Sequence, residues 1–102
     1  MRTIELRAEN WTSVLDFYHA LLASLEAPKW HGEGINAALD SIVWGGINGV
    51  KPPYTIRIVG VSRLAPEIRR EIELLAKHIV EHRGHYRRQH RKDVEVALEV
   101  VP

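Results

Sequence analysis

Apolar positions repeat along the chain with two periods, and these periods predict the order of its elements. Residues 3–7 alternate Ile4 and Leu6 with charged side chains, which predicts a strand with one buried face. Residues 54–61 (YTIRIVGV) are almost all apolar or β-branched, as expected of a strand covered on both faces, with Arg57 near a sheet edge or rim. Residues 93–101 alternate again and predict the last strand.

Three other segments carry apolar side chains at helical spacing. The first begins at a capping-box-like pair, Ser13 and Asp16, and we expect Pro28 to end it. The second is a short helix from about residue 35, followed by a Gly- and Pro-rich loop at residues 44–53. The third spans residues 66–83 and begins at Pro66. The predicted core positions are Val14, Phe17, Leu21, Leu22, Leu25, Ile35, Ala38, Leu39, Ile42, Ile68, Ile72, Leu75 and Ile79.

The predicted order is strand, helix, short helix, strand, helix, strand. Strands that are separated by helices need crossover connections, which make neighbouring strands parallel. We therefore predict an α/β fold, a small three-stranded parallel β-sheet packed against helices (β-α-α-β-α-β). With 102 residues, the chain fits a single domain, residues 1–102, with one hydrophobic core.

Composition narrows the functional classes. The chain has no cysteine, so disulfides, thiolate metal ligands and a cysteine nucleophile are excluded. We also find no apolar signal core at the start and no run long enough to cross a bilayer. These features favour a cytoplasmic protein without a membrane partner.

The formal net charge is +1, but basic residues concentrate in segment 83–92. Clustered Arg and Lys side chains around Tyr86 could follow phosphates, so a nucleic-acid-binding module with salt-sensitive binding is one hypothesis. The segment is short and no recognition motif surrounds it, which favours a solvated helix end and makes a nucleic-acid partner the less favoured prediction.

No catalytic or metal-binding motif is evident. His78 and His82 are one helical turn apart with His85 close behind, but Glu81 falls on a neighbouring face and a zinc site needs further ligands. The sequence has no nucleophile elbow, no phosphate-binding glycine loop and no dinucleotide fingerprint. We therefore predict a binding protein rather than an enzyme, with no metal and no cofactor.

The stretch PKWHGEGINAALDS (residues 28–41) is the strongest candidate for a binding site. It places Trp30, His31, Gly32 and Gly34 ahead of a short helix whose outward positions are Asn36 and Asp40. Each residue type also has an ordinary structural use: core packing for Trp30, solvation for Asp40 and turn geometry for the glycines.

This stretch resembles the signature of the barstar family, the small intracellular inhibitors of secreted ribonucleases. In that family a Pro, an aromatic pair, a Gly and an acidic residue precede a short helix with outward acidic side chains. The similarity continues without a gap from residue 2 to about residue 41, and the order of elements also agrees with the family's fold. Only residues 44–52 look longer here.

The resemblance implies a protein that binds one cognate toxin, a ribonuclease domain, in a 1:1 complex and occludes its active site. Asp40 matches the carboxylate that takes the place of the scissile phosphate. Trp30 and His31 match the aromatic pair that covers the catalytic site, and the backbone approaches the enzyme at Gly32 and Gly34. We expect Trp44 to make a rim contact from the longer loop. A different protein partner on the same fold is a third hypothesis, distinguished by insensitivity to changes at Trp30 and Asp40.

Several positions depart from the family pattern. Asn36 replaces a second Asp, Leu39 stands where the family often has Trp, and His31 can take up a proton. The chain is also close to neutral, whereas acidity steers the best-known members to basic ribonucleases. These departures predict a partner that is less basic around its cleft.

Overall fold

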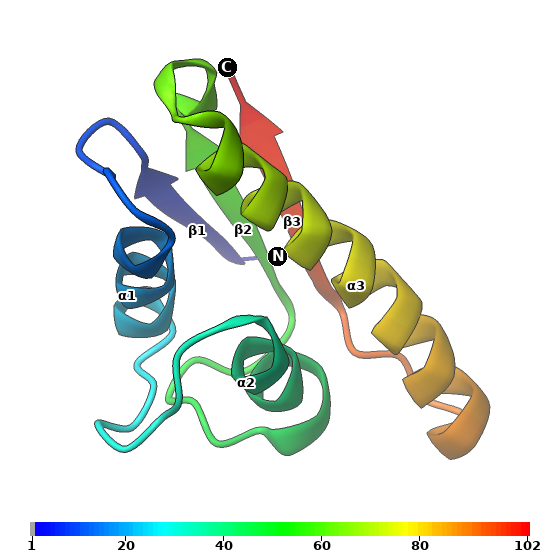
Figure 1. Cartoon of the computed structure of the whole chain (residues 1–102). Coiled ribbons are helices and arrows are strands. Elements are labelled where there is room, and N and C mark those ends of the chain that lie inside the picture. Colours follow the sequence, from blue (N-terminus) through cyan, green and yellow to red (C-terminus); the bar gives the residue numbers. More distant parts are fainter. Residues whose placement is uncertain (1) are drawn as a thin grey trace.

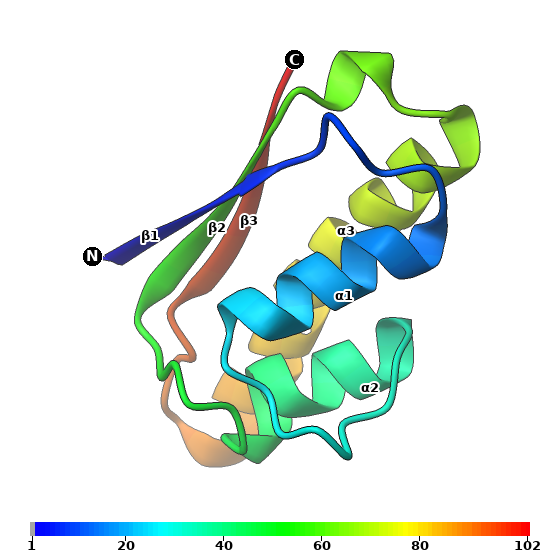
Figure 2. The same cartoon turned by 90° about the vertical axis from the view of Figure 1, so that its left-hand side faces the viewer.

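The computed structural model describes residues 2–102, which form a three-stranded parallel sheet with all helices on one face (Figures 1 and 2). The strand order is β1-β2-β3. The predicted order of elements and the parallel sheet are confirmed. The bounds are β1 Arg2–Arg7, α1 Val14–Ser24, α2 Ile35–Leu39, a π-helical segment η1 Asp40–Gly45, β2 Tyr54–Val59, a 3₁₀ turn η2 Val61–Arg63, α3 Pro66–His90 and β3 Val96–Val101.

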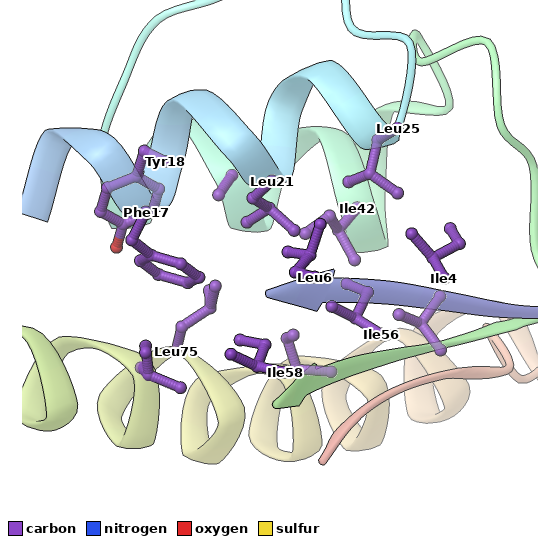
Figure 3. Packing of buried hydrophobic residues seen from close by; sticks show 14 of the residues in the cluster. Ile4, Leu6, Phe17, Tyr18, Leu21, Leu25, Ile42, Ile56, Ile58 and Leu75 are labelled. Carbon is purple, nitrogen blue, oxygen red and sulfur yellow. The ribbon is translucent and has the colours of Figure 1, made fainter. Parts of the chain in front are cut away.

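The core lies between the sheet and the helices. Figure 3 shows Ile4 and Leu6 of β1 and Ile56 and Ile58 of β2 pointing toward Phe17 and Leu21 of α1 and Leu75 of α3. The Tyr18 hydroxyl, at the core boundary, donates to Glu71 Oε2 (2.5 Å) and joins α1 to α3. Every residue of the α1 and α3 core stripes except Val14 is buried, and Val14 packs at the margin of the cluster.

The other face of the sheet is uncovered, which corrects the prediction for the second strand. Buried and partly exposed residues alternate along β2, so only one of its faces is covered. Arg57 lies in the middle of the sheet rather than at an edge. Its guanidinium lies 3.7 Å from Glu5 and 3.5 Å from Glu99, its partners in the strand register. A cross-strand ion-pair row therefore replaces apolar packing on this open face.

Several boundaries differ from the predictions. The second strand ends at Val59 instead of residue 61, because Gly60 is left-handed (φ 83°) and η2 begins at Val61. The first helix ends at Ser24, before Pro28, because the chain turns through a left-handed Glu26 (φ 55°). The short helix continues as η1 to Gly45, so residues 44 and 45 are not loop. Helix α3 runs to His90 instead of residue 83. The last strand begins at Val96 instead of residue 93, because residues 93–95 connect α3 to the sheet.

The predicted capping box at the start of α1 is confirmed. The backbone N–H of Asp16 donates to Ser13 Oγ (3.3 Å), and the N–H of Ser13 donates back to the Asp16 carboxylate (3.2 Å). The Thr12 backbone N–H also donates to that carboxylate (2.8 Å) and is the main cause that lowers the pKa of Asp16. These bonds use N–H groups that the first turn would otherwise leave unpaired.

Ser13→Ala is expected to lower the free energy of unfolding by about 1 kcal/mol, the usual value of an N-cap hydroxyl. Urea unfolding of the variant and the parent protein measures the difference. Ser62→Ala, at an exposed serine in η2, is the matched control and should change stability by less than about 0.5 kcal/mol. Equal stability of the parent protein and the Ser13 variant would contradict the role of this cap.

Candidate functional site

The connection between α1 and α2 displays an indole ring to solvent. Trp30 lies in a turn closed by the His31 N–H, which donates to the Pro28 carbonyl (2.9 Å), and its side chain is 74% exposed. Core packing, the ordinary use of this residue type, is therefore excluded for Trp30. A ring with this exposure offers a large apolar contact area to a partner.

Trp30 borders a surface hollow of about 240 Å³ that also contains Asp40. Ile47, which is 44% exposed, supplies a second apolar side chain. Asp40 is the only carboxylate among the described residues that line the hollow. The lining residues are Trp30, His31, Gly32, Ala37, Asp40, Ser41, Gly45 and Ile47.

Four of the seven predicted site residues therefore meet in one place: Trp30, His31, Gly32 and Asp40. Two others flank it. Gly34 is the N-cap residue of α2 and has a φ of 119°, which an L side chain rarely adopts. Asn36 is exposed on α2, one turn before Asp40, but it does not line the hollow.

Trp44, which was predicted to make a rim contact from a loop, lies in η1, so its predicted loop position is wrong. Its indole packs on α3, where its Nε1–H donates to His82 Nδ1 (2.9 Å). Its ring also contacts Tyr86, with the ring centroids 5.3 Å apart, and His90, at 6.3 Å. Trp44 therefore anchors η1 to α3 and is half-buried.

The wide π-helical turn sets the position of Asp40. Asp40 is the first residue of η1, and Gly45 closes the turn against its backbone. A Cβ on Gly45 would lie 2.9 Å from the Asp40 carbonyl oxygen, closer than side-chain carbons approach. On the buried side of η1, Ser41 donates to the Ala38 carbonyl (3.3 Å) and accepts from Asn48 Nδ2 (3.1 Å). The turn that carries the Asp40 carboxylate is thus fixed by hydrogen bonds on its buried side.

The loop that carries Trp30 is held by two polar contacts. The His31 Nδ1–H donates to the Gly32 carbonyl (2.5 Å), which fixes the orientation of the ring. Glu33 Oε1 lies 3.0 Å from His19 Nε2 and ties the loop to α1. His19 is exposed on α1 and provides this link.

Sequence reasoning missed four lining residues of the hollow: Ala37, Ser41, Gly45 and Ile47. The Gly45–Gly46 pair was visible as a signal for an unusual backbone, but its interpretation as a loop hid the turn behind Asp40. Ile47 gave no signal, because an isolated apolar residue beside two glycines is common in loops.

The basic segment is engaged largely within the chain. Arg83 forms a two-pronged contact with Asp93, through Nε to Oδ1 (3.2 Å) and Nη2 to Oδ2 (2.7 Å), and its Nη1 donates to the Val96 carbonyl (2.8 Å). Arg87 lies 3.8 Å from the same carboxylate, and Arg88 contacts His85 Nδ1 (2.9 Å). The Arg83 contacts join the end of α3 to Asp93 and to β3, while the side chains of Arg87, Arg88, Arg91 and Lys92 are exposed.

Asp93→Asn is expected to destabilise the protein near neutral pH but not in strong acid. Hydrogen bonding from Arg83 lowers the pKa of Asp93 below its usual value of 3.8. The stabilisation is therefore complete above that value and is lost as the pH falls through the lowered pKa. Because the carboxylate is partly exposed, we expect a difference of about 1 kcal/mol or less.

Urea unfolding of the parent protein and the variant between about pH 2 and pH 7 measures this effect. This range includes the ordinary pKa of an Asp side chain, about 3.9. The two proteins should converge in stability at the acid end. A constant difference over the whole range would contradict an ionised Asp93–Arg83 pair.

The histidines of α3 form a row of ring contacts. The ring centroids of His78 and His82 are 6.1 Å apart, and those of His82 and His85 are 6.3 Å apart. Among residues 2–102, no group of three or more His, Asp or Glu side chains is arranged to hold a metal ion. His82 Nδ1 is already used by Trp44, so within this row it is His82 that packs against η1.

Comparison with known proteins gives no identification, since no family model and no curated protein matches the chain. None of the helices in the described part of the chain has the length and apolar character needed to cross a membrane. The function is therefore argued from the site itself.

Proposed function

We propose that this protein is a barstar-like intracellular inhibitor, an immunity or antitoxin protein that occludes the active site of a cognate ribonuclease-type toxin. One observation carries the proposal: the stretch that resembles the family signature forms a hollow in which Trp30 and Ile47 border the carboxylate of Asp40. The parallel β-α-α-β-α-β architecture, with this stretch between α1 and η1, agrees with the same family.

The chemistry of the hollow suits the active site of a nuclease. Such an enzyme arranges cationic and hydrogen-bonding groups around the scissile phosphate, and a carboxylate at the same place satisfies them. Asp40 supplies the negative charge, and the exposed Trp30 ring covers the rim of the cleft and excludes water. Asn36 adds a neutral hydrogen-bonding group one turn away.

The charge distribution favours local over long-range attraction. With a net charge of +1, the whole chain does not attract a basic enzyme. The partner is therefore a nuclease whose cleft is cationic but whose surrounding surface is not strongly basic. Binding occurs in the cytoplasm as a 1:1 complex, and the protein performs no chemistry.

The proposal is tested with tagged parent protein and toxin domains encoded beside its gene. We expect capture of a nuclease domain, and loss of its RNA cleavage when one equivalent of the protein is added. Capture without inhibition would overturn active-site occlusion. Equal capture and inhibition by a Trp30→Ala, Asp40→Ala double variant would move the interface to another surface of the same fold.

A further inference from the structure

The hydrogen bond from Trp44 to His82 joins η1 to α3 across 38 positions of sequence. An indole N–H can only donate, so the Nδ1 atom of His82 accepts with its lone pair. A neutral imidazole in this state carries its hydrogen on Nε2. Protonation of His82 would place an N–H group against the N–H of Trp44, and the bond would be lost.

Trp44 lies four residues after Asp40 in the same π-helical segment. Its indole is wedged on α3 among His82, Tyr86 and His90. The other side-chain hydrogen bonds of the segment, from Ser41 to the Ala38 carbonyl and from Asn48 to Ser41, stay within residues 38–48. Among the hydrogen bonds of the described residues, the Trp44–His82 bond is thus the one that fixes the Asp40 turn to the long helix.

Several charged groups near His82 have polar partners of their own. On α3, His78 Nδ1 lies 3.3 Å from Glu81, and His85 Nδ1 accepts from Arg88 (2.9 Å). Arg83 is occupied by Asp93 at the β3 end. Trp44 faces His82 from η1, whose only charged side chain is Asp40, and α2 has no ionisable side chain. The other elements packed on α3 carry the ionisable side chains Asp16, Tyr18 and His19 of α1 and Glu99 of β3. Along α3 itself the remaining ones are Glu67, Arg69, Arg70, Glu71, Glu73, Lys77, Tyr86, Arg87 and His90.

We infer that His82 is a positioning residue: its neutral form accepts the hydrogen bond by which Trp44 ties the turn that displays Asp40 to α3, and its protonation breaks that bond. Partner binding at the hollow should therefore weaken when the protein is acidified. This consequence for binding rests on the proposed function, whereas loss of the Trp44–His82 bond does not.

The first experiment follows the three indole N–H signals of the free protein by ¹⁵N NMR between about pH 5.5 and pH 8, which bracket the ordinary imidazole titration. We expect the Trp44 signal to shift in acid and to lose its protection from exchange with water relative to the Trp11 signal, which serves as the internal reference. His82→Asn places an amide oxygen, two bonds from Cβ like Nδ1, where it can accept the same bond without titrating. It should remove the pH response. His85→Asn is the matched control and should keep it.

A Trp44 signal that does not change over this pH range in the parent protein would overturn the inference. So would an equal response in folded His82→Asn. His82→Phe, which has no acceptor, should show the acid-type Trp44 signal at every pH, and this variant keeps the test decisive if His82→Asn is poorly folded.

The second experiment measures the affinity for the captured nuclease at the two ends of the range. The parent protein should bind about fivefold more weakly in acid, the equivalent of the ~1 kcal/mol that a neutral hydrogen bond contributes. His82→Asn should lose this difference relative to His85→Asn. If no nuclease binds at all, the proposed function fails while the indole signals still decide the role of His82. Equal pH dependence of binding in both variants would overturn the positioning role.

Discussion

Asp40→Ala is expected to weaken binding to the cognate nuclease by about 2–5 kcal/mol, which corresponds to a loss of roughly 30-fold or more. In the proposed complex the carboxylate is covered by Trp30 and faces the cationic groups of the enzyme. Its removal leaves those groups buried without an anion, and that penalty adds to the lost attraction. Isothermal titration or competition for the enzyme's substrate measures the change.

Two further variants sharpen this experiment. Asp40→Asn keeps the shape of the side chain and removes its charge, so it should lose most of the same affinity. Glu9→Ala removes an exposed carboxylate in the β1–α1 connection, at the opposite end of the molecule from α2 (Figure 2), and should bind like the parent protein. The free energy of unfolding of the Asp40 variants should stay within about 0.5 kcal/mol of the parent, as for an exposed position. Unchanged affinity of folded Asp40→Ala would contradict the phosphate-mimic role.

The site was largely predictable from one short stretch of sequence, because its residues are neighbours in the chain. Trp30, His31 and Gly32 directly precede the short helix that ends before Asp40, and all four residues line the same hollow. The turn that supports Asp40 was not predictable in the same way. It depends on the hydrogen bond between Trp44 of η1 and His82 of α3, which are far apart in the sequence, and no local pattern encodes such a contact.

The errors in the predicted helix and strand assignments have a similar origin. The helical stripe of α3 ends at Ile79, so sequence periodicity gave no reason to extend the helix through a glycine and a run of arginines. The structure supplies that reason in the Arg83–Asp93 pair and in the packing of Tyr86 on Trp44. Apolar residues at the second strand also predicted two covered faces, but valine and threonine are favoured on open faces of sheets as well.

The largest effect on stability is expected at Phe17, where alanine should lower the free energy of unfolding by about 3–5 kcal/mol. Phe17 is fully buried between Trp11 and Tyr18, with ring centroids 5.5 Å and 4.8 Å away. A domain of this kind has only about 5–15 kcal/mol of stability, so the variant should unfold at a much lower urea concentration.

Leu15→Ala is the matched control for Phe17→Ala, because it shortens an apolar side chain on the same helix at a position that is 50% exposed. Leucine and alanine both favour helices, so we expect this change to cost about 0.5 kcal/mol or less. Phe17 does not line the hollow, and the folded fraction of Phe17→Ala should bind the nuclease with parental affinity. Equal losses of stability in the two variants would contradict the role of Phe17 as a core residue. A loss of affinity per folded Phe17→Ala molecule would show that core packing beneath α1 affects the binding surface.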